Sequence, residues 1–237
     1  MVLGTKERIV ADRQFSTERY ILSTNPVLYL PLYRLDGTSF RSADGVGHTC
    51  TVTGASWTPQ GRSYDAVPDD YITCGDLTRF QFSGDFTAWA WVSMPALPGA
   101  ASYPRIFCKQ DTVSPYPGWF LRLQATTGYW LFSLTDSAAN NMGASYAVPP
   151  TLNTSYFVAG VRSGSTANIY INGNIVGTAT NALVGSVAAV GYPLYVGSNR
   201  SAADRWTGYI KEAGLNSRAL TPLEIQNIFL ATKWRYQ

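Results

Sequence analysis

Short runs in which apolar and polar residues alternate, separated by turn residues, dominate this sequence. The clearest is 167–176, where Asn172-Gly173 separates two such runs. Asparagine and glycine both tolerate a positive φ, so this pair predicts a tight β-hairpin. Further runs of this kind lie at 27–32, 86–92, 119–124, 130–135, 156–162, 194–197 and 206–215. Many short strands at regular spacing predict an all-β fold, an antiparallel two-sheet sandwich of the jelly-roll type.

The run 86–92 has no polar face. Side chains alternate between the two faces of a strand. The even-numbered residues from Phe86 to Val92 therefore share one apolar face, and the odd-numbered residues include Trp89 and Trp91. We expect this strand to be buried on both sides.

One helix is indicated near the C-terminus. Thr221 suits its cap, Pro222 suits its first position, and Glu224 completes a Thr-x-x-Glu capping box. The apolar stripe that follows consists of Leu223, Ile225, Ile228, Phe229 and Leu230. We expect one short helix after the last strand.

Residues 1–26 show no clean periodicity and end at the turn signal Asn25-Pro26. Their apolar residues could form only a poor amphipathic helix, and these are Ile9, Val10, Phe15, Tyr20 and Ile21. We therefore expect an N-terminal arm over 1–26, outside the main fold, and a single jelly-roll domain over 27–237. The length permits this, since β-sandwiches commonly reach roughly 200–250 residues as one domain.

The composition excludes several classes of partner. Lys, Arg, Asp and Glu make up 14% of the chain, against about 25% in ordinary domains. The net charge is +3, and no block of Lys and Arg could follow a phosphate backbone, so we expect no nucleic-acid partner. No apolar run approaches the roughly 20 residues of a membrane span, so we expect no membrane partner. A sparsely charged surface suits contact with sugars or with other proteins.

The chain has three cysteines, Cys50, Cys74 and Cys108. An odd number cannot form a complete disulfide framework, and the sequence lacks a Cys-x-x-Cys pair or a second histidine that could bind zinc. We expect three buried, reduced thiols.

Five segments, in order along the chain, carry a resemblance to a known family. They read RLDG with DGVGH at 34–48, SYDAVPDDYI at 63–72, FTAWAWV at 86–92, FVAGV with GST and YING at 157–173, and YVGS with GYIKE and SRALTPLEI at 195–225. Together they resemble the laminin-G-like domains of the concanavalin A-like lectin/glucanase superfamily. The resemblance covers nearly the whole chain after the arm. It implies two antiparallel sheets, one convex and one concave.

The resemblance does not extend to catalytic residues. Glycoside hydrolases of this superfamily place Glu-x-Asp-x-x-Glu on one strand, because glycoside hydrolysis needs two carboxylates. The sequence has four glutamates, Glu7, Glu18, Glu212 and Glu224. None forms such a pair, and Asp69-Asp70 fits a turn. The one histidine, His48, lies in a glycine-rich loop without the Gln-x-His strand of alginate-lyase-like jelly rolls. We therefore expect no enzymatic activity, and we expect His48 to form hydrogen bonds within its loop.

The resemblance also implies a structural Ca²⁺ site. Ca²⁺ binds six to eight oxygen ligands, and the positions that match the family are Asp44, the Gly47 carbonyl and Glu212. The chain departs from the family at Lys211, where relatives carry an aspartate, so a cation beside the site could replace the metal. The alternative is that Asp44 caps its own turn.

Aromatic rings stack on the C–H faces of sugars, and amides bind their hydroxyl groups. We therefore take as candidate ligand-binding residues Tyr103, Tyr116, Trp119, Asn140, Asn141, Tyr146 and Trp206.

Two hypotheses for function follow. The first is a non-catalytic structural or interaction protein of a phage virion surface, such as a capsid decoration or tail protein. It would be homo-oligomeric and would bind other copies of itself and other virion or surface proteins. The alternative is a carbohydrate-binding, lectin-like module that binds glycans.

Three features favour the virion hypothesis. The chain starts at Met1 as a stand-alone domain, and it lacks the apolar region of a secretory signal. Relatives of this type usually act outside cells, and lysis would bring a virion protein there. The aromatic, sparsely charged surface also suits subunit contacts. We expect a location at the virion surface, or otherwise outside the cell without a signal peptide.

Overall fold

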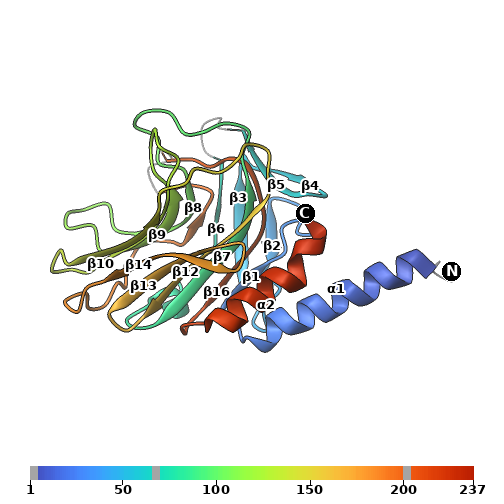
Figure 1. Ribbon diagram of the computed structural model, residues 1–237, viewed down its shortest axis with the longest axis horizontal. Coiled ribbons are helices and arrows are strands. Elements are labelled where there is room, and N and C mark those ends of the chain that lie inside the picture. The colour runs from blue at the N-terminus through green and yellow to red at the C-terminus, as the bar shows by residue number, and fades with distance from the viewer. Residues whose placement is uncertain (1–4, 66–69, 200–203) are drawn as a thin grey trace.

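The computed structural model describes residues 5–65, 70–199 and 204–237 (Figure 1). Within these ranges two antiparallel sheets pack face to face, which confirms the predicted sandwich. No helix in these ranges has the length and apolar character needed to cross a membrane. Residues 1–4 of the predicted arm and Asp69 of the predicted turn pair lie outside the described residues.

Sheet A has the strand order β14 (Asn174–Thr180), β13 (Thr166–Ile171), β12 (Tyr156–Ser163), β7 (Phe86–Ser93), β16 (Thr207–Asn216), β5 (Gly61–Asp65) and β4 (Ser56–Thr58), with β1 (Leu28–Leu30) paired to β16. Sheet B has the order β11 (Asn141–Tyr146), β10 (Trp130–Thr135), β9 (Gly118–Leu123), β8 (Arg105–Gln110), β15 (Tyr195–Val196), β6 (Tyr71–Thr73), β3 (Thr49–Thr53) and β2 (Ser39–Arg41). A short 3₁₀ helix, η1, spans Thr78–Phe80.

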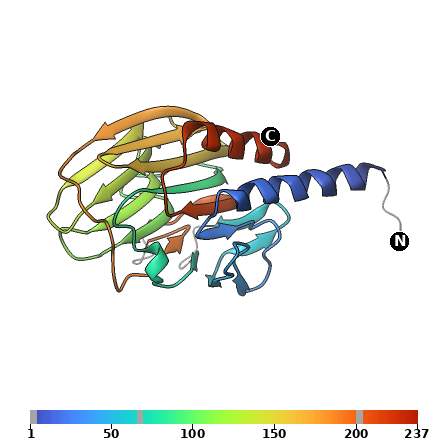
Figure 2. The ribbon, with the colours of Figure 1, turned by 90° about the horizontal axis from the view of Figure 1, so that it is seen from below.

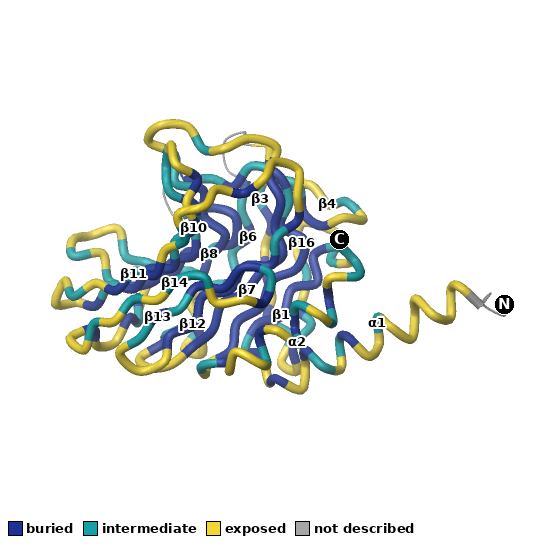
Figure 3. Tube along the Cα trace, viewed as in Figure 1, coloured by how far each residue is buried: buried dark blue, intermediate teal, exposed yellow. Residues whose placement is uncertain are grey.

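The strand β7 is buried on both sides, as its sequence predicts. Phe86 and Val92 belong to the core between the two sheets. Trp89 and Trp91 face a second core, which lies between sheet A and the helix α2 (Pro222–Thr232). Figure 3 shows the central strands as the most deeply buried part of the chain. A strand between two cores has no need of polar residues on either face.

The predicted hairpin and helix cap are both confirmed. Asn172 and Gly173 join β13 to β14 with φ values of 51° and 81°. At the start of α2, the Glu224 backbone N–H donates to Thr221 Oγ1 at 3.2 Å. The Thr221 backbone N–H donates to Glu224 Oε2 at 2.8 Å, which closes the capping box. A 3₁₀ turn, η2 (Lys233–Arg235), follows α2.

The N-terminal segment differs from the irregular arm predicted. It forms the helix α1 (Thr5–Ser23), which extends away from the sandwich (Figure 2). Only its last turns are packed: Thr17 Oγ1 donates to the Ala231 carbonyl at 2.8 Å, and Ile21 is buried in the second core. The earlier turns leave Phe15 70% exposed. Only one side of the last two turns of α1 packs against the rest of the protein. For this reason the sequence of α1 lacks a continuous apolar stripe.

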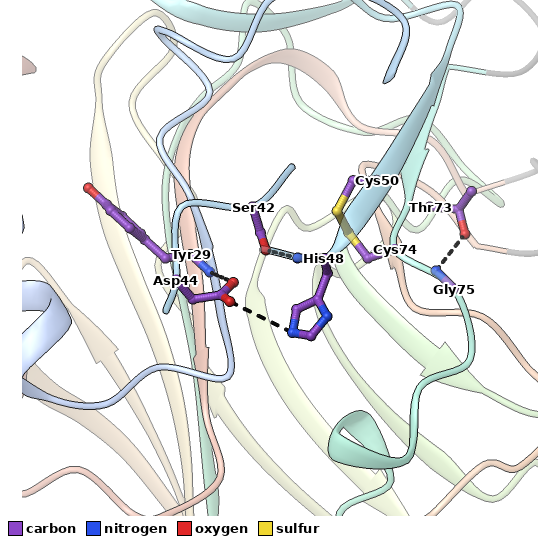
Figure 4. Close-up of a disulfide and its surroundings, with 8 residues drawn as sticks. All are labelled: Tyr29, Ser42, Asp44, His48, Cys50, Thr73, Cys74 and Gly75. Carbon is purple, nitrogen blue, oxygen red and sulfur yellow. Dashed lines mark hydrogen bonds and ion pairs between the residues drawn. A yellow bond between two sulfur atoms is a disulfide. The ribbon is translucent and has the colours of Figure 1, made fainter. Parts of the chain in front are cut away.

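The expectation of three reduced thiols is wrong. Cys50 of β3 and Cys74, directly after β6, form a disulfide with a Cα–Cα separation of 4.3 Å (Figure 4). The register of β3 against β6 pairs Thr51 with Thr73, so Cys50 and Cys74 are the next residues to meet. Cys108 is free and buried.

Candidate ligand-binding site

Sheet B has an outer face that neither α-helix of the described chain covers. Both helices pack on sheet A, where Ile21 of α1 and Ile225 of α2 join the second core. On sheet B, Trp119 of β9 belongs to the core, and the alternating residues Phe120 and Arg122 face the other way. Phe120 is buried and Arg122 is half-buried, so of these two Arg122 is the one that keeps surface for a ligand.

Two arginines share one aromatic ring on this face. The guanidinium carbon of Arg105 lies 4.3 Å from the ring centroid of Phe120, and that of Arg122 lies 4.4 Å from it. Arg122 also lies 4.4 Å from the ring centroid of Tyr103. Cation–π contacts of this kind hold a guanidinium flat against the ring. With Asp204, these four residues form what we call the arginine cluster.

The arginine cluster holds two positive charges and one carboxylate. Asp204 Oδ2 accepts from Arg105 Nη2 at 3.2 Å, and Asp204 Oδ1 accepts from the Tyr103 backbone N–H at 3.2 Å. Arg122 Nη2 donates to Gln124 Oε1 at 3.2 Å, and its Nε is buried without a hydrogen-bond partner. Among the described residues, Arg122 thus has no ion pair with a carboxylate such as the one that Arg105 forms.

Burial and the neighbouring charge of Arg105 lower the pKa of Arg122 to about 10, against a smaller opposing effect of Asp204. Arg105 and Arg122 are directly opposite in the register of β8 and β9. Like charges at such a position repel each other. Arg122 is still protonated at neutral pH, so an anion bound here would relieve both the burial of its charge and the repulsion.

A cavity of about 280 Å³ adjoins the arginine cluster. Small-molecule pockets commonly measure roughly 300–1,000 Å³, so this one suits a group no larger than a single sugar ring. It is lined by Arg105, Cys108, Gln110, Asp111, Thr112, Tyr116 and Asn199. Tyr116 is 51% exposed, and its φ of 60° lies in the left-handed region that non-glycine residues rarely adopt. Burial raises the pKa of Cys108, so its thiol stays protonated.

Two of the predicted ligand-binding residues, Tyr103 and Tyr116, lie at this site. Two others, Trp119 and Trp206, do not lie at the site. They have no exposed surface and belong to the core between the sheets. A ligand could reach neither ring without opening the sandwich.

The remaining three lie at β11 and the turn before it. Asn140 Nδ2 donates to Asp136 Oδ2 at 3.0 Å, and Asn141 Nδ2 donates to the Leu134 carbonyl at 3.0 Å. Tyr146 is half-buried against the core. These contacts hold the turn and the edge strand together, away from the arginine cluster.

Asp44 caps its own loop, and Figure 4 shows its contacts with Tyr29 and His48. Its Oδ1 accepts from the backbone N–H groups of Val46 and Gly47 at 3.0 and 3.1 Å, and its Oδ2 accepts from the Tyr29 backbone N–H at 3.2 Å. The Gly47 carbonyl accepts from Arg41 Nη1 at 2.9 Å. His48 Nε2 lies 3.7 Å from Asp44 Oδ1, within the same loop.

Glu212 is buried at the other end of Tyr29. It accepts from the Tyr29 hydroxyl at 2.6 Å, from the Tyr236 hydroxyl at 2.9 Å and from Arg235 Nη1 at 3.2 Å. Burial raises the pKa of Glu212, and the charge of Arg235 opposes that rise. Arg235, not Lys211, is therefore the cation beside this carboxylate.

These contacts do not fit the calcium site that the family resemblance implies. Asp44 and Glu212 contact opposite ends of Tyr29, and the Gly47 carbonyl already faces a guanidinium. In the described part of the chain, no three His, Cys, Asp or Glu side chains gather in a way that could hold a metal ion.

The sequence offered a weak signal for the two arginines. Arg122 stands at an outward position of a strand whose alternate residues are apolar, in a chain that carries few charges. Only the pairing of β8 with β9 brings Arg105 beside Arg122.

Comparison with known proteins agrees with the fold. A family model described as the concanavalin A-like lectin/glucanases superfamily matches residues 65–226. No curated protein sequence matches the chain.

Solved structures with the same fold include receptor-binding parts of toxins. The binding domain of Paraclostridial Mosquitocidal Protein 1 has a TM-score of 0.69 at 15% identity, over 88% of this chain and 52% of that chain. The ligand binding domain of botulinum neurotoxin serotype D, in complex with N-acetylneuraminic acid, has a TM-score of 0.70 at 12% identity, over 90% of this chain and 52% of that chain. This chain thus spans about half the length of those toxin domains.

A sialidase of Trypanosoma rangeli, in complex with sialic acid, has a TM-score of 0.67 at 15% identity, over 98% of this chain and 39% of that chain. At such identities the likeness shows the fold alone. The family match, in contrast, covers more than half of the sequence. The chain belongs to the concanavalin A-like lectin/glucanase superfamily.

Proposed function

We propose that this protein is a non-catalytic carbohydrate-binding module that holds an acidic sugar at the arginine cluster. The observation that carries the proposal is the unpaired charge of Arg122, stacked between Phe120 and Tyr103. A guanidinium matches a carboxylate with two parallel hydrogen bonds. The adjoining cavity adds the amide of Gln110 and the ring of Tyr116, which suit hydroxyl groups and a sugar face.

Two of the similar structures support an acidic sugar as the ligand class. The neurotoxin domain and the sialidase are described in complex with N-acetylneuraminic acid and sialic acid, which carry a carboxylate. The contacts of three acidic side chains support a non-catalytic role. Asp204 is held by Arg105, Glu212 is buried under three donors, and Glu224 caps a helix.

Calorimetric titration with 3′-sialyllactose and with lactose tests the proposal. We expect sialyllactose to bind and lactose to bind at least about tenfold more weakly, a difference of about 1.4 kcal/mol. Arg122→Gln should remove that preference, and Arg79→Gln, at an exposed arginine of η1, should keep it. Equal binding of the two sugars would overturn the proposal. Release of 4-methylumbelliferone from its sialoside would overturn the non-catalytic part.

Self-assembly of the protein through the exposed turns of α1 is a second candidate function. It corresponds to the virion-surface hypothesis. The first turns of α1 expose Ile9, Val10 and Phe15 to solvent. Exposed apolar side chains on one helix suit contact with another protein. The similar structures named above are toxin domains and a sialidase, which favour sugar binding instead.

Light scattering on the full chain tests this second candidate. A homo-oligomer that becomes a monomer on Phe15→Glu would support assembly through α1. A monomer at all concentrations would exclude self-assembly.

A further inference from the structure

Lys211 is the extra residue of a β-bulge. In the pairing of β16 with β7, Ile210 is opposite Val92 and Glu212 is opposite Trp91, so Lys211 has no opposite residue. Bulges of this kind redirect a side chain and are common beside binding sites. Gly61 packs directly on the bulge: a Cβ there would lie 2.5 Å from the Lys211 Cα. The glycine thus allows β5 to approach the bulge closely.

The Lys211 ammonium is buried without an acidic partner. Its residue is 8% exposed, and Nζ donates to Ser155 Oγ at 2.8 Å. Its other neighbours are the ring centroids of Tyr209 and Tyr236, at 5.9 and 5.7 Å. An ammonium has three protons to donate, and among the described residues no carboxylate forms an ion pair with this one. Burial lowers the pKa of Lys211, as expected for a charge that lacks a counter-ion.

Lys211 lines two neighbouring cavities, of about 530 and 520 Å³, that also share Gln60. The first, which we call the Lys211 pocket, is lined on sheet A by hydroxyl, amide and ring groups that include Ser63, Asn153 and Tyr209. Its size suits a small molecule, and these groups suit a hydroxylated one. Asp65 also lines this pocket, and its carboxylate disfavours a ligand with more than one negative charge.

We propose that the Lys211 pocket is a second ligand site, which binds a hydroxylated small molecule through a single carboxylate held by the Lys211 ammonium. The ligand's carboxylate would complete the donor set of Nζ beside Ser155. Its hydroxyl groups would meet Gln60, Ser63 and Asn153, and its body would lie against the ring of Tyr209. The site is on sheet A and uses no residue of the arginine cluster, so it stands independently of the function proposed above.

NMR titration of the isotope-labelled full chain with D-glucuronate, and with D-glucose as its uncharged match, tests the proposal. We expect glucuronate to shift the side-chain amide signals of Gln60 and Asn153, and glucose to leave them unchanged. Lys211→Met should weaken glucuronate binding at least about tenfold, since a hydrogen bond to a charged group is lost. Lys6→Met, at an exposed lysine of α1, should leave the affinity unchanged.

Further variants separate this site from the arginine cluster and from effects on folding. Arg122→Gln should bind glucuronate at the Lys211 pocket as the wild type does, even if it loses sialyllactose. Gln60→Ala, in the exposed turn between β4 and β5, keeps the core intact and should still weaken binding. Unchanged affinity in both Lys211→Met and Gln60→Ala would overturn the proposal. Tighter binding of glucose 6-phosphate than of glucuronate would overturn the choice of a single carboxylate.

Discussion

Glu224 is a single carboxylate that fixes where a helix begins. Arg218 Nη2 donates to its Oε1 at 2.6 Å, and the Thr221 backbone N–H donates to its Oε2. The guanidinium first, and then the capping contacts, lower the pKa of Glu224 to about 2 from an ordinary value of 4.5. The folded chain therefore holds this proton less tightly than the unfolded chain. Its stabilising effect is present above the ordinary value and is lost as the pH falls towards 2.

We predict that Glu224→Gln lowers the free energy of unfolding by about 1 kcal/mol at neutral pH, because it weakens the cap and a partly exposed ion pair. The difference from the wild type should shrink when the pH is lowered to about 2.5. Urea unfolding at both pH values measures it, with Glu7→Gln in the exposed part of α1 as the control. An equal loss at both pH values would contradict the assignment.

From the hydrogen bonds of Asp44 and Glu212 we also predict how the protein responds to calcium. Their oxygens accept from backbone N–H groups, phenols and a guanidinium, so the metal would have to displace these donors. We expect the thermal midpoint in about 10 mM Ca²⁺ to equal that in EDTA. A site with a dissociation constant of about 1 mM would instead add about 1.4 kcal/mol of stability, a readily measured rise.

At the scale of elements, the sequence predicted those structures that depend on contacts between neighbouring residues. The hairpin at Asn172-Gly173, the doubly buried strand β7 and the cap of α2 each depend on residues within a few positions of one another. The packing of α1 could not be predicted locally, because Thr17 donates to Ala231, 214 residues further along the chain, and Ile21 packs in the second core. No window of the N-terminal sequence contains that information.

The hairpin provides the test at this scale. Gly173 has a φ of 81°, and an added Cβ would lie 3.0 Å from Phe229 Cδ1 of α2. Gly173→Ala should therefore destabilise the protein by about 1–2 kcal/mol, through backbone strain and through the contact with α2. Gly45→Ala, at a turn where an added Cβ meets nothing within 4 Å, should change stability little. Chemical denaturation of both variants measures the difference, and equal effects would exclude this account.

In the whole molecule, the sites arise from pairings that no local pattern predicts. Arg105 and Arg122 meet through the register of β8 and β9, and Cys50 and Cys74 meet through that of β3 and β6. A shift of one residue in either register would send these side chains to the opposite face. The superfamily could be predicted from motifs in order along the chain. The arginine cluster depends instead on the pairing of β8 with β9, and the Lys211 pocket on the pairing of β16 with β5 and β7.

The attachment of α1 to the sandwich is itself a property of the whole molecule. Ile21 is fully buried in the second core, and Asn216 Nδ2 donates to the Thr24 carbonyl at 3.0 Å. Residues 6–13 are exposed. Removal of residues 1–13 should therefore leave the free energy of unfolding unchanged.

Removal of residues 1–26 should lower the free energy of unfolding by about 3 kcal/mol. The loss of Ile21 creates a cavity in the second core, and Asn216 loses its hydrogen-bond partner. Thermal and urea unfolding of the two truncated chains, compared with Ile21→Ala in the full chain, measure both effects. If the shorter truncation were as damaging as the longer one, the exposed turns of α1 would have to contact something that stabilises the fold. If the longer truncation were harmless, residues 27–237 would fold without the helix, and the second core would be complete with α2 alone.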